Sequence, residues 1–399
     1  MALAPLDRQR LQEALALAEG SFGISDPNPR VGCVLGNVEG QVFGHGATQE
    51  AGGPHAEVMA LRDARSRSFD LRGATAWVTL EPCAHQGRTP PCCDALIGAG
   101  VARVVVALPD PFPAVNGAGI ARMRAAGIEV IQADGEIAAA AAYINIGFLS
   151  RVARGRPWVR LKVAASLDGK TALLNGSSQW ITSEVSRRDA HGWRHRASAV
   201  LTGIGTALAD DPRLDVRTFS RARQPLRVVL DTRFRLAAEA KLLAPPGDVL
   251  LVGAIDPAAA NPALVATGAE LLCIPGTDGR VDLGATLAEL GRRGVNELHI
   301  EAGAALNGAF LKGTWVDEVL VYLAPKLLGP GRPMLEWSPL QVLEAGLGLE
   351  VQTIRPCGPD VVIRAQTAGG LSFRGDVSEG LAKPDTRTAS IVMHRHTAP

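Results

Sequence analysis

The feature that most constrains the fold is a set of possible metal ligands divided between three short motifs. His55 lies in "PHAE", Cys83 in "EPC", and Cys92 and Cys93 in "PPCC". The three cysteines are half of the six in the 399 residues. Each motif stands where a loop meets the end of a predicted helix or strand. A fold that gathers them must bring three segments of an α/β layer pattern together.

Composition indicates a soluble globular chain of two or three domains, with 47% hydrophobic and 20% charged residues. The formal net charge of +1 gives no broad field that would attract nucleic acid or a membrane. The N-terminal segment lacks signal-peptide order, and its Leu11, Leu15 and Ala18 have helical spacing. The longest apolar run is too short and interrupted to span a bilayer. We expect a cytoplasmic protein whose scattered thiols serve metal binding or catalysis rather than disulfides.

The predicted elements form two successive α/β series. The first has a hairpin at "RVGCVLG" and "QVFGHG", helices at "PHAEVMALRDA" and "CDALIGAG", and strands at "TAWVTLE" and "VARVVVAL". The second has strands at "WVRLKVAAS", "SAVLTG", "LRVVLD", "DVLLVG" and "LHIEAG", and helices around "SRRDAHGWRHRA" and "NGAFLKG". The basic segment "SRVARGRPW" separates them near Ala153. We therefore predict domains at 1–152 and 153–366 and a flexible tail at 367–399.

His55, Cys83 and Cys92 together predict a catalytic zinc site. One imidazole and two thiolates leave a tetrahedral zinc ion one open position, which suits a water molecule. Taken singly, a histidine before a helix is more often a cap, and adjacent cysteines are often small buried apolar groups. Their joint order favours zinc. Cys93 points about 100° away from Cys92 on a helix, so we expect it in the core.

Glu57 is the predicted proton carrier of this site. Two residues along a helix correspond to a rotation of about 200°, so His55 and Glu57 do not hold one ion side by side. A carboxylate there can take a proton from water, pass it to a substrate ring nitrogen and help ammonia leave. His-x-Glu followed by Pro-Cys-x-x-Cys is the zinc-deaminase signature. Here eight residues separate Cys83 from Cys92.

This longer loop, ending in "PPCC", closely resembles the deaminase half of the bifunctional pyrimidine deaminase/reductase family of riboflavin biosynthesis. The resemblance includes "DPNPRVGCVLG", "AGGPHAEVMAL", "VTLEPCAHQGRTPPCCDALIGAGVARV" and "DPFPAVNGAGI" and covers almost all of residues 7–150. It implies a cytidine-deaminase-like, three-layer α/β domain.

One position departs from the family pattern. Thr48 stands where the resemblance implies a histidine near the substrate. His45, three residues earlier on a predicted strand, is a possible substitute, although a structural role is the better expectation. His85 and Arg88 lie in the loop between the cysteines, where substrate contact and simple solvation are nearly equal alternatives.

The C-terminal half carries weak signals of its own. Gly203-Ile204-Gly205 is not a complete phosphate motif, and a helix start at "GAALNG" could receive a phosphate or be a structural turn. "LKVAASLDGKTAL", "GSSQWITSEVSRRDAHGWRHRASAVLTGIGTALADDPRLDVR", "LRVVLDT", "IEAGAALNGAFL" and "VDEVLVYLAPKLLG" resemble the reductase half of the same family, over residues 157 to about 365. This resemblance implies a dihydrofolate-reductase-like fold that binds NADPH.

Carried over by motif, the resemblance implies two sets of site residues. The expected NADPH ligands are Ala164, Trp180, Thr206, Asp210, Thr232, Gly303, Ala304, Ala305, Leu306, Asn307, Gly308 and Ala309. The expected substrate ligands are Ser178, Arg194, Leu214, Arg217 and Glu301. The two arginines suit a sugar phosphate, which needs fixed cationic donors.

The expected function is zinc-dependent hydrolytic deamination of a phosphoribosylated diaminopyrimidinone, followed by NADPH-dependent reduction of its ribosylamino group to ribitylamino. We also expect a homo-oligomer with small-molecule substrates and no nucleic-acid or membrane partner. Two alternatives belong to other classes. A nucleic-acid-editing deaminase would need basic grooves and aromatic platforms, whereas aromatic residues are 4% here. A zinc-stapled binding module would need a fourth ligand, for which Cys93 is the nearby candidate.

Overall fold

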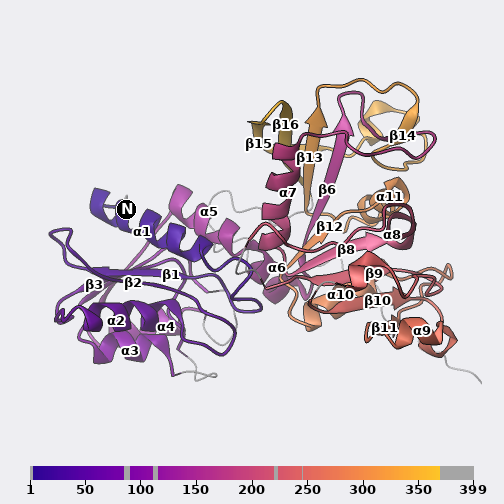
Figure 1. Ribbon diagram of the computed structural model, residues 1–399. Helices are drawn as coiled ribbons and strands as arrows, with labels where there is room; N and C mark the ends of the chain where they lie inside the picture. Colours follow the sequence, from indigo (N-terminus) through magenta and orange to yellow (C-terminus); the bar gives the residue numbers. More distant parts are fainter. Residues whose placement is uncertain (1–2, 85–89, 111–115, 220–222, 245, 369–399) are drawn as a thin grey trace, which may run out of the picture.

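The buried apolar residues form separate clusters in the two halves of the chain. The computed structural model describes residues 3–84, 90–110, 116–219, 223–244 and 246–368. Among these residues, the N-terminal domain has one core, with buried residues from Leu11 to Leu149, and the C-terminal domain has three smaller clusters, the first of which begins at Val159. Helix α6 (Ile146–Arg154) lies between the two domains, and the expected boundary near Ala153 falls in its last turn (Figure 1). Most of the expected tail, from residue 369 onward, lies outside the described residues, whereas Thr367 ends a strand.

The N-terminal domain is built on a five-stranded sheet with the order β2-β1-β3-β4-β5. The first two strands form the predicted antiparallel hairpin, and β3, β4 and β5 run parallel. Their bounds are β1 Gly32–Gly36, β2 Val42–Ala47, β3 Thr75–Val78, β4 Arg103–Val106 and β5 Glu129–Gln132.

Helices cover both faces of this sheet, which confirms the predicted three-layer arrangement (Figure 1). One face carries α1 (Pro5–Glu19) and α5 (Gly135–Ile144). The other carries α2 (Ala56–Ser66), α3 (Cys92–Gly98) and α4 (Ala118–Ala125). No helix among the described residues is both long enough and apolar enough to cross a bilayer.

Two glycines allow α2 to approach the sheet closely. A Cβ atom on Gly46 would lie 2.0 Å from the carbonyl oxygen of Ala56, and one on Gly44 would lie 2.4 Å from that of Ala60. Side chains at these positions of β2 would push the helix away. The strand sequence "VFGHGA" therefore sets the distance between the sheet and α2, the helix that begins after His55.

The C-terminal domain is built on a nine-stranded sheet with the order β11-β10-β9-β8-β12-β6-β13-β16-β15. The seven neighbouring strands that begin with β11 and end with β13 in this order run parallel to one another. At the β13 end, β16 and then β15 extend the sheet with antiparallel pairing. The bounds are β6 Trp158–Ser166, β8 Ala199–Gly203, β9 Leu226–Leu230, β10 Val249–Gly253, β11 Glu270–Cys273, β12 Glu297–Ile300, β13 Glu318–Ala324, β15 Leu349–Cys357 and β16 Asp360–Thr367.

The remaining elements of this domain surround the main sheet. A separate small sheet pairs β7 (Lys170–Leu173) with β14 (Gly331–Pro333). The helices are α7 Glu184–Arg196, α8 Ile204–Asp210, α9 Pro262–Val265, α10 Leu283–Arg292 and α11 Ala304–Lys312.

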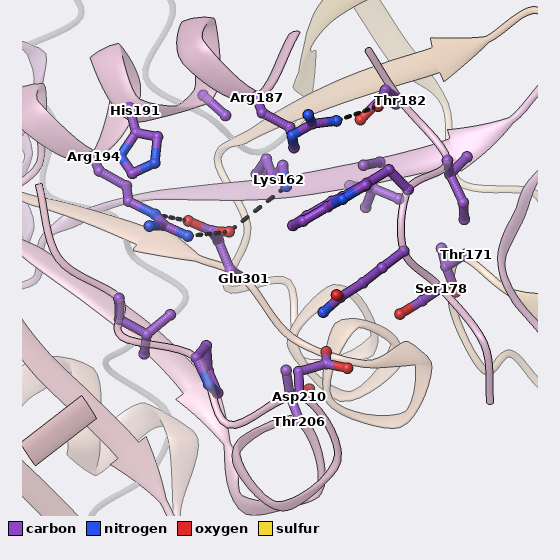
Figure 2. Close-up of a pocket in the computed structure, with 18 of the residues that line it drawn as sticks. Lys162, Thr171, Ser178, Thr182, Arg187, His191, Arg194, Thr206, Asp210 and Glu301 are labelled. Atoms are coloured by element: carbon purple, nitrogen blue, oxygen red, sulfur yellow. Dashed lines mark hydrogen bonds and ion pairs between the residues drawn. The ribbon is translucent and has the colours of Figure 1, made fainter. Parts of the chain in front are cut away.

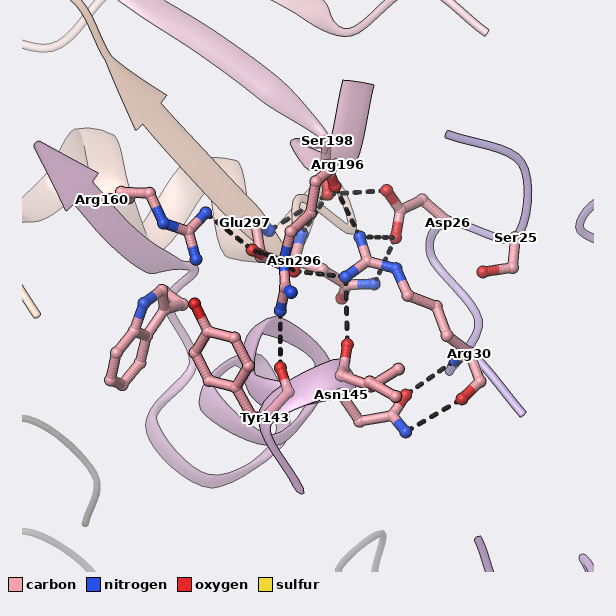
Figure 3. Close-up of polar contacts among 12 residues, drawn as sticks. Ser25, Asp26, Arg30, Tyr143, Asn145, Arg160, Arg196, Ser198, Asn296 and Glu297 are labelled. Atoms are coloured by element: carbon pink, nitrogen blue, oxygen red, sulfur yellow. Dashed lines mark hydrogen bonds and ion pairs between the residues drawn. The ribbon is translucent and has the colours of Figure 1, made fainter. Parts of the chain in front are cut away.

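A buried cluster of ion pairs joins the two domains (Figure 3). Arg30, just before β1, reaches Glu297 of β12. The same carboxylate accepts hydrogen bonds from Arg160 at 2.9 Å and from Arg196 at 2.8 Å. Burial opposes ionisation of Glu297, but these three guanidinium groups hold its pKa below the usual range. Because Glu297 is fully buried, its partners depend on it for charge compensation.

The rim of this interface is hydrogen-bonded as well. Asn145 of the N-terminal domain accepts the backbone N–H of Arg30 at 2.7 Å and donates to its carbonyl at 3.0 Å. Asp26 accepts hydrogen bonds from Ser198 at 2.9 Å and from Asn296 at 2.8 Å, both of the other domain. The segment that leads into β1 is therefore held by residues of both domains.

Candidate active sites

The predicted zinc ligands lie together in the N-terminal domain. His55 stands at the N-cap position of α2 without a capping hydrogen bond from its side chain, Cys83 follows the end of β3, and Cys92 opens α3. The His55 Nδ1 atom lies 3.7 Å from the Cys83 sulfur and 3.3 Å from the Cys92 sulfur. Zinc bonds to sulfur and nitrogen at tetrahedral angles would place such atoms about 3.6 Å apart. The three ligand atoms lie within 4.8 Å of one another, so the group fits one zinc ion.

The two thiols interact, and this shifts their pKa values in opposite directions. The hydrogen bond from Cys92 lowers the pKa of the Cys83 thiol to about 4, and contact with the resulting thiolate raises the pKa of Cys92. The backbone N–H of Cys92 also donates to the Cys83 sulfur at 3.3 Å. A hydrogen bond to Cys83 raises the pKa of His55. A divalent cation is the natural partner for such a cluster, because it stabilises thiolates.

Glu57 lies buried in the first turn of α2, beside the cluster. Burial, and then the charge of Cys83, raise the pKa of its carboxyl group to about 7. A carboxyl group that both gains and loses a proton near neutral pH suits general acid/base catalysis. The burial and the raised pKa support the proton-carrier role of Glu57, which stays a prediction.

Other residues singled out in the sequence take structural places. Cys93 is fully buried in the N-terminal core, as expected, and is not part of the ligand cluster. The Thr48 hydroxyl accepts the backbone N–H of Val31 at 3.1 Å. His45 directs its backbone N–H to Asp63 at 2.9 Å, and its ring lies 4.0 Å from the same carboxylate. His85 and Arg88 lie outside the described residues.

Glu81, in the "EPC" motif, is a supporting residue that the sequence prediction missed. It is buried two residues before Cys83 and accepts backbone hydrogen bonds of 3.0 to 3.2 Å from Asp110, Gly117, Gly119 and Ile120. These bonds tie the start of α4 to the strand end that presents Cys83. An acidic residue directly before a Pro-Cys ligand was the available signal.

A second candidate site is a cavity of about 670 Å³ in the C-terminal domain (Figure 2). It lies near the carboxyl ends of β6, β8 and β12, where parallel sheets usually bind ligands. All five predicted substrate ligands line it, as do five of the predicted NADPH ligands: Ser178, Arg194, Leu214, Arg217 and Glu301, with Ala164, Trp180, Thr206, Asp210 and Asn307.

The other predicted NADPH ligands are not among the lining residues. Thr232 follows β9, and Gly303 precedes α11. The rest belong to the first turns of α11, where Leu306 packs on the core; they are Ala304, Ala305, Leu306, Gly308 and Ala309. They lie at the same edge of the sheet as the cavity, because β8, β9 and β12 are parallel neighbours.

Ion pairs organise the substrate end of the cavity (Figure 2). Glu301 accepts two hydrogen bonds from Arg194, one of them at 3.0 Å, and lies 3.6 Å from the Lys162 ammonium group. Burial opposes its ionisation, but Arg194 and Lys162 hold the pKa of Glu301 well below its usual range. Arg217 is paired with Asp215 at 2.6 Å. Both predicted phosphate ligands are therefore fixed by carboxylates.

Three further lining residues were not predicted from the sequence. Lys162 precedes Ala164 by two positions on β6, so both face the same side of the sheet. On α7, Arg187 lies two turns before Arg194 and His191 lies one turn before it. Arg187, His191 and Arg194 are spaced four and three residues apart on one helix, and residues at this spacing share a face. This spacing was the available signal for Arg187 and His191.

Comparison with known proteins agrees with this division. Residues 5–108 match the family described as the cytidine and deoxycytidylate deaminase zinc-binding region, and residues 157–363 match the RibD C-terminal domain. The chain is 42% identical over 370 residues to the riboflavin biosynthesis protein RibD of Escherichia coli K12, covering 90% of this chain and 98% of the relative. It is 38% identical over 358 residues to RibD of Aquifex aeolicus, with the same coverage.

Solved structures show the same similarity across both domains. RibD of Acinetobacter baumannii is 40% identical and superposes with a TM-score of 0.82, covering 91% of this chain and 99% of that one. A deaminase/reductase of Thermotoga maritima is 32% identical, with the same TM-score and coverage.

These findings establish both halves of the expected chemistry. The N-terminal domain is a cytidine-deaminase-like zinc domain, and the C-terminal domain is an NADPH-dependent reductase. Both the nucleic-acid-editing and the zinc-staple alternatives are set aside, because the similarity covers the deaminase and the reductase together. The chain belongs to the RibD family of bifunctional deaminase/reductase enzymes of riboflavin biosynthesis.

Proposed function

We propose that the two sites act in sequence on one phosphoribosylated pyrimidine. The similar Thermotoga maritima protein is a diaminohydroxyphosphoribosylaminopyrimidine deaminase and 5-amino-6-(5-phosphoribosylamino)uracil reductase. In this chain, the first site deaminates 2,5-diamino-6-ribosylamino-4(3H)-pyrimidinone 5′-phosphate, and the second reduces the ribosylamino product to the ribitylamino compound. The observation that carries the proposal is a His/Cys/Cys cluster beside a buried glutamate, together with a separate charged cavity.

In the deaminase site, His55, Cys83 and Cys92 hold the metal. When bound, zinc supplies Lewis acidity that lowers the pKa of water towards roughly 7. Glu57 accepts a proton from the attacking water and delivers it to the ring nitrogen next to the amino-bearing carbon. It then moves a second proton to the amino group, which leaves as ammonia while the carbonyl forms. The raised pKa of Glu57 supports this alternation.

In the reductase site, the chain's residues position the two reactants. NADPH supplies the hydride that is transferred to C1′ of the sugar. The twelve predicted NADPH ligands, of which Ala164 is the first and Ala309 the last in the sequence, bind the cofactor. Ser178, Leu214 and Glu301 orient the pyrimidine and sugar, and the two arginines hold the phosphate. The ion pair between Arg194 and Glu301 supports this arrangement, because it fixes the guanidinium plane before substrate arrives.

A homo-oligomer in the cytoplasm is part of the proposal. β15 is an edge strand of the nine-stranded sheet, and its Leu349, Val351 and Ile354 are 45%, 51% and 65% exposed. An exposed apolar edge of this kind favours pairing with another chain. All six cysteines are free thiols, which supports a reducing compartment.

The direct test is to supply the purified protein with the phosphoribosylated diaminopyrimidinone. Without NADPH, we expect ammonia release and accumulation of the ribosylamino uracil phosphate. With NADPH, we expect the ribitylamino product and matching NADPH oxidation. NADPH oxidation with the diamino compound before any ammonia release would contradict the proposed order.

A further inference from the structure

His191 lines the reductase cavity, and the similarity to the family assigns it no role. It lies on α7, four residues after Arg187 and three before Arg194, so the three side chains leave the same helix face. All three line the cavity, and His191 lies beside Arg194 (Figure 2). The ring is therefore next to one of the two proposed phosphate ligands.

One nitrogen atom of the His191 ring also lacks a hydrogen-bond partner among the described residues. This atom, Nδ1, is buried. A buried polar atom without a partner costs free energy, so such atoms in native proteins are usually paired with protein, water or ligand. An unpaired Nδ1 atom alone does not indicate a ligand, since His195 on the same helix has one too; His191 differs because it lines the cavity beside Arg194.

The charges around His191 come from its own helix and from two other segments of the domain. Arg194 is on its own helix, Arg217 and Asp215 are on the segment after α8, and Glu301 follows β12. Burial, followed by repulsion from Arg194 and Arg217, lowers the pKa of His191 to about 4. The imidazole is consequently neutral at pH 7 when the cavity holds no anion.

The nearby carboxylates do not offset this repulsion fully, because each is already paired. Asp215 binds both Arg213 and Arg217. Glu301 binds Arg194 and Lys162. A phosphate group would add unpaired negative charge and acceptor oxygens next to the ring. Such a group favours the protonated imidazole, which can donate a charge-assisted hydrogen bond.

We propose that His191 is a third ligand of the substrate phosphate in the reductase site, beside Arg194 and Arg217, and that it takes up a proton from solvent when the phosphate binds. The inference rests on the proposed function, which assigns the phosphate to this end of the cavity. It makes His191 a determinant of specificity for phosphorylated over unphosphorylated substrate.

The sign of the pH effect follows from linkage. The complex binds more protons than the free enzyme, so the contribution of His191 to affinity falls as pH rises. The fall begins above pH 4 and ends where the raised pKa in the complex is passed. Above that pH, His191 contributes only the weaker hydrogen bond of a neutral imidazole.

The test compares wild type with His191→Asn and His191→Gln. The probe is the ribosylamino uracil 5′-phosphate without NADPH, titrated calorimetrically at pH 7 in buffers of different ionisation enthalpy. Wild type should take up more protons than either variant, because ionisation of the substrate phosphate itself is common to all three. In steady state, the variants should raise KM for the phosphorylated substrate about 10-fold to 100-fold, with little change for its dephosphorylated form.

His195→Asn is the matched control. His195 is on the same helix and also has a buried Nδ1 atom without a partner among the described residues, but its ring stacks on Phe219 and is not part of the cavity lining. This variant should bind the probe like wild type. Equal proton uptake by wild type, His191→Asn and His191→Gln would overturn the inference.

A second comparison separates this inference from the proposed function. If Arg217→Ala weakens phosphate binding and the His191 variants do not, only the role of His191 is wrong. If Arg217→Ala and the His191 variants all bind both substrate forms like wild type, the phosphate does not bind at this end of the cavity.

Discussion

The zinc cluster and the reductase cavity differ in how much of each site the chain completes by itself. In the zinc cluster, three ligand atoms lie within 4.8 Å of one another and form a site that only a bound metal completes. In the cavity, Arg194 and Arg217 already have carboxylate partners. Loss of one zinc ligand should therefore abolish the first site, whereas loss of one cavity residue should weaken the second by degrees.

The largest effect is expected from Cys83→Ser or Cys92→Ser. A hydroxyl group is a poor substitute for a thiolate as a zinc ligand, so both metal and deamination should be lost. Metal analysis and ammonia release provide the measurement. Cys93→Ala is the matched control and should keep its zinc, because Cys93 lies outside the cluster. Full deamination by a metal-free Cys83→Ser protein would contradict the assignment.

Glu57→Gln should have the next largest effect, and it separates chemistry from metal binding. The amide keeps the shape of the side chain but carries no proton between water and substrate. Deamination turnover should fall by about 10²-fold to 10⁴-fold, while zinc content stays stoichiometric. If turnover stayed near wild type, another group would have to carry the proton.

Glu297→Gln tests whether the two sites are held by one framework. It removes the charge that compensates Arg30, Arg160 and Arg196 in the buried interface. The free energy of unfolding should fall by about 3–5 kcal/mol, measured by urea denaturation. Glu184→Gln is the control, because that residue forms an exposed pair with Arg188 and should not change stability measurably. Equal stability of the two variants would mean that the interface cluster contributes little.

The smallest effect is expected from Arg217→Ala in the cavity. Its side chain is 55% exposed, so solvent already weakens its electrostatic interactions. We expect KM for the ribosylamino uracil phosphate to rise about 10-fold, the lower range for a hydrogen bond to a charged group. Arg292→Ala, a surface change on α10, should leave KM unchanged. No change in KM for Arg217→Ala would remove it from the substrate site.

Local sequence patterns predicted the parts of the molecule that local interactions determine. The zinc ligands stand in short motifs at element ends, and apolar runs such as "LRVVLD" become buried parallel strands. β15 (Leu349–Cys357) was not predicted; most of its residues are exposed, and its pairing with β16 makes it a strand. Lys162 and His191 lie in segments that resemble the reductase family, but no site role was predicted for them; the structure places both in the cavity wall, on β6 and α7.

The domain interface was beyond sequence reasoning for a similar reason. Arg30 and Glu297 are 267 positions apart, and nothing around either residue indicates the other. The expected division near Ala153 suggests two units joined by a linker. The structure instead has a helix at that place and a buried charge cluster across the two domains.

The central claim, that one chain carries two chemically independent sites, is tested most directly by the reductase activity of Glu57→Gln. Supplied with the ribosylamino uracil phosphate, the variant should oxidise NADPH at nearly the wild-type rate. Supplied with the diamino precursor, it should stall with zinc still bound. If a folded, zinc-loaded Glu57→Gln protein failed to oxidise NADPH with the deaminated compound as well, the two reactions would share a site and the account would be wrong.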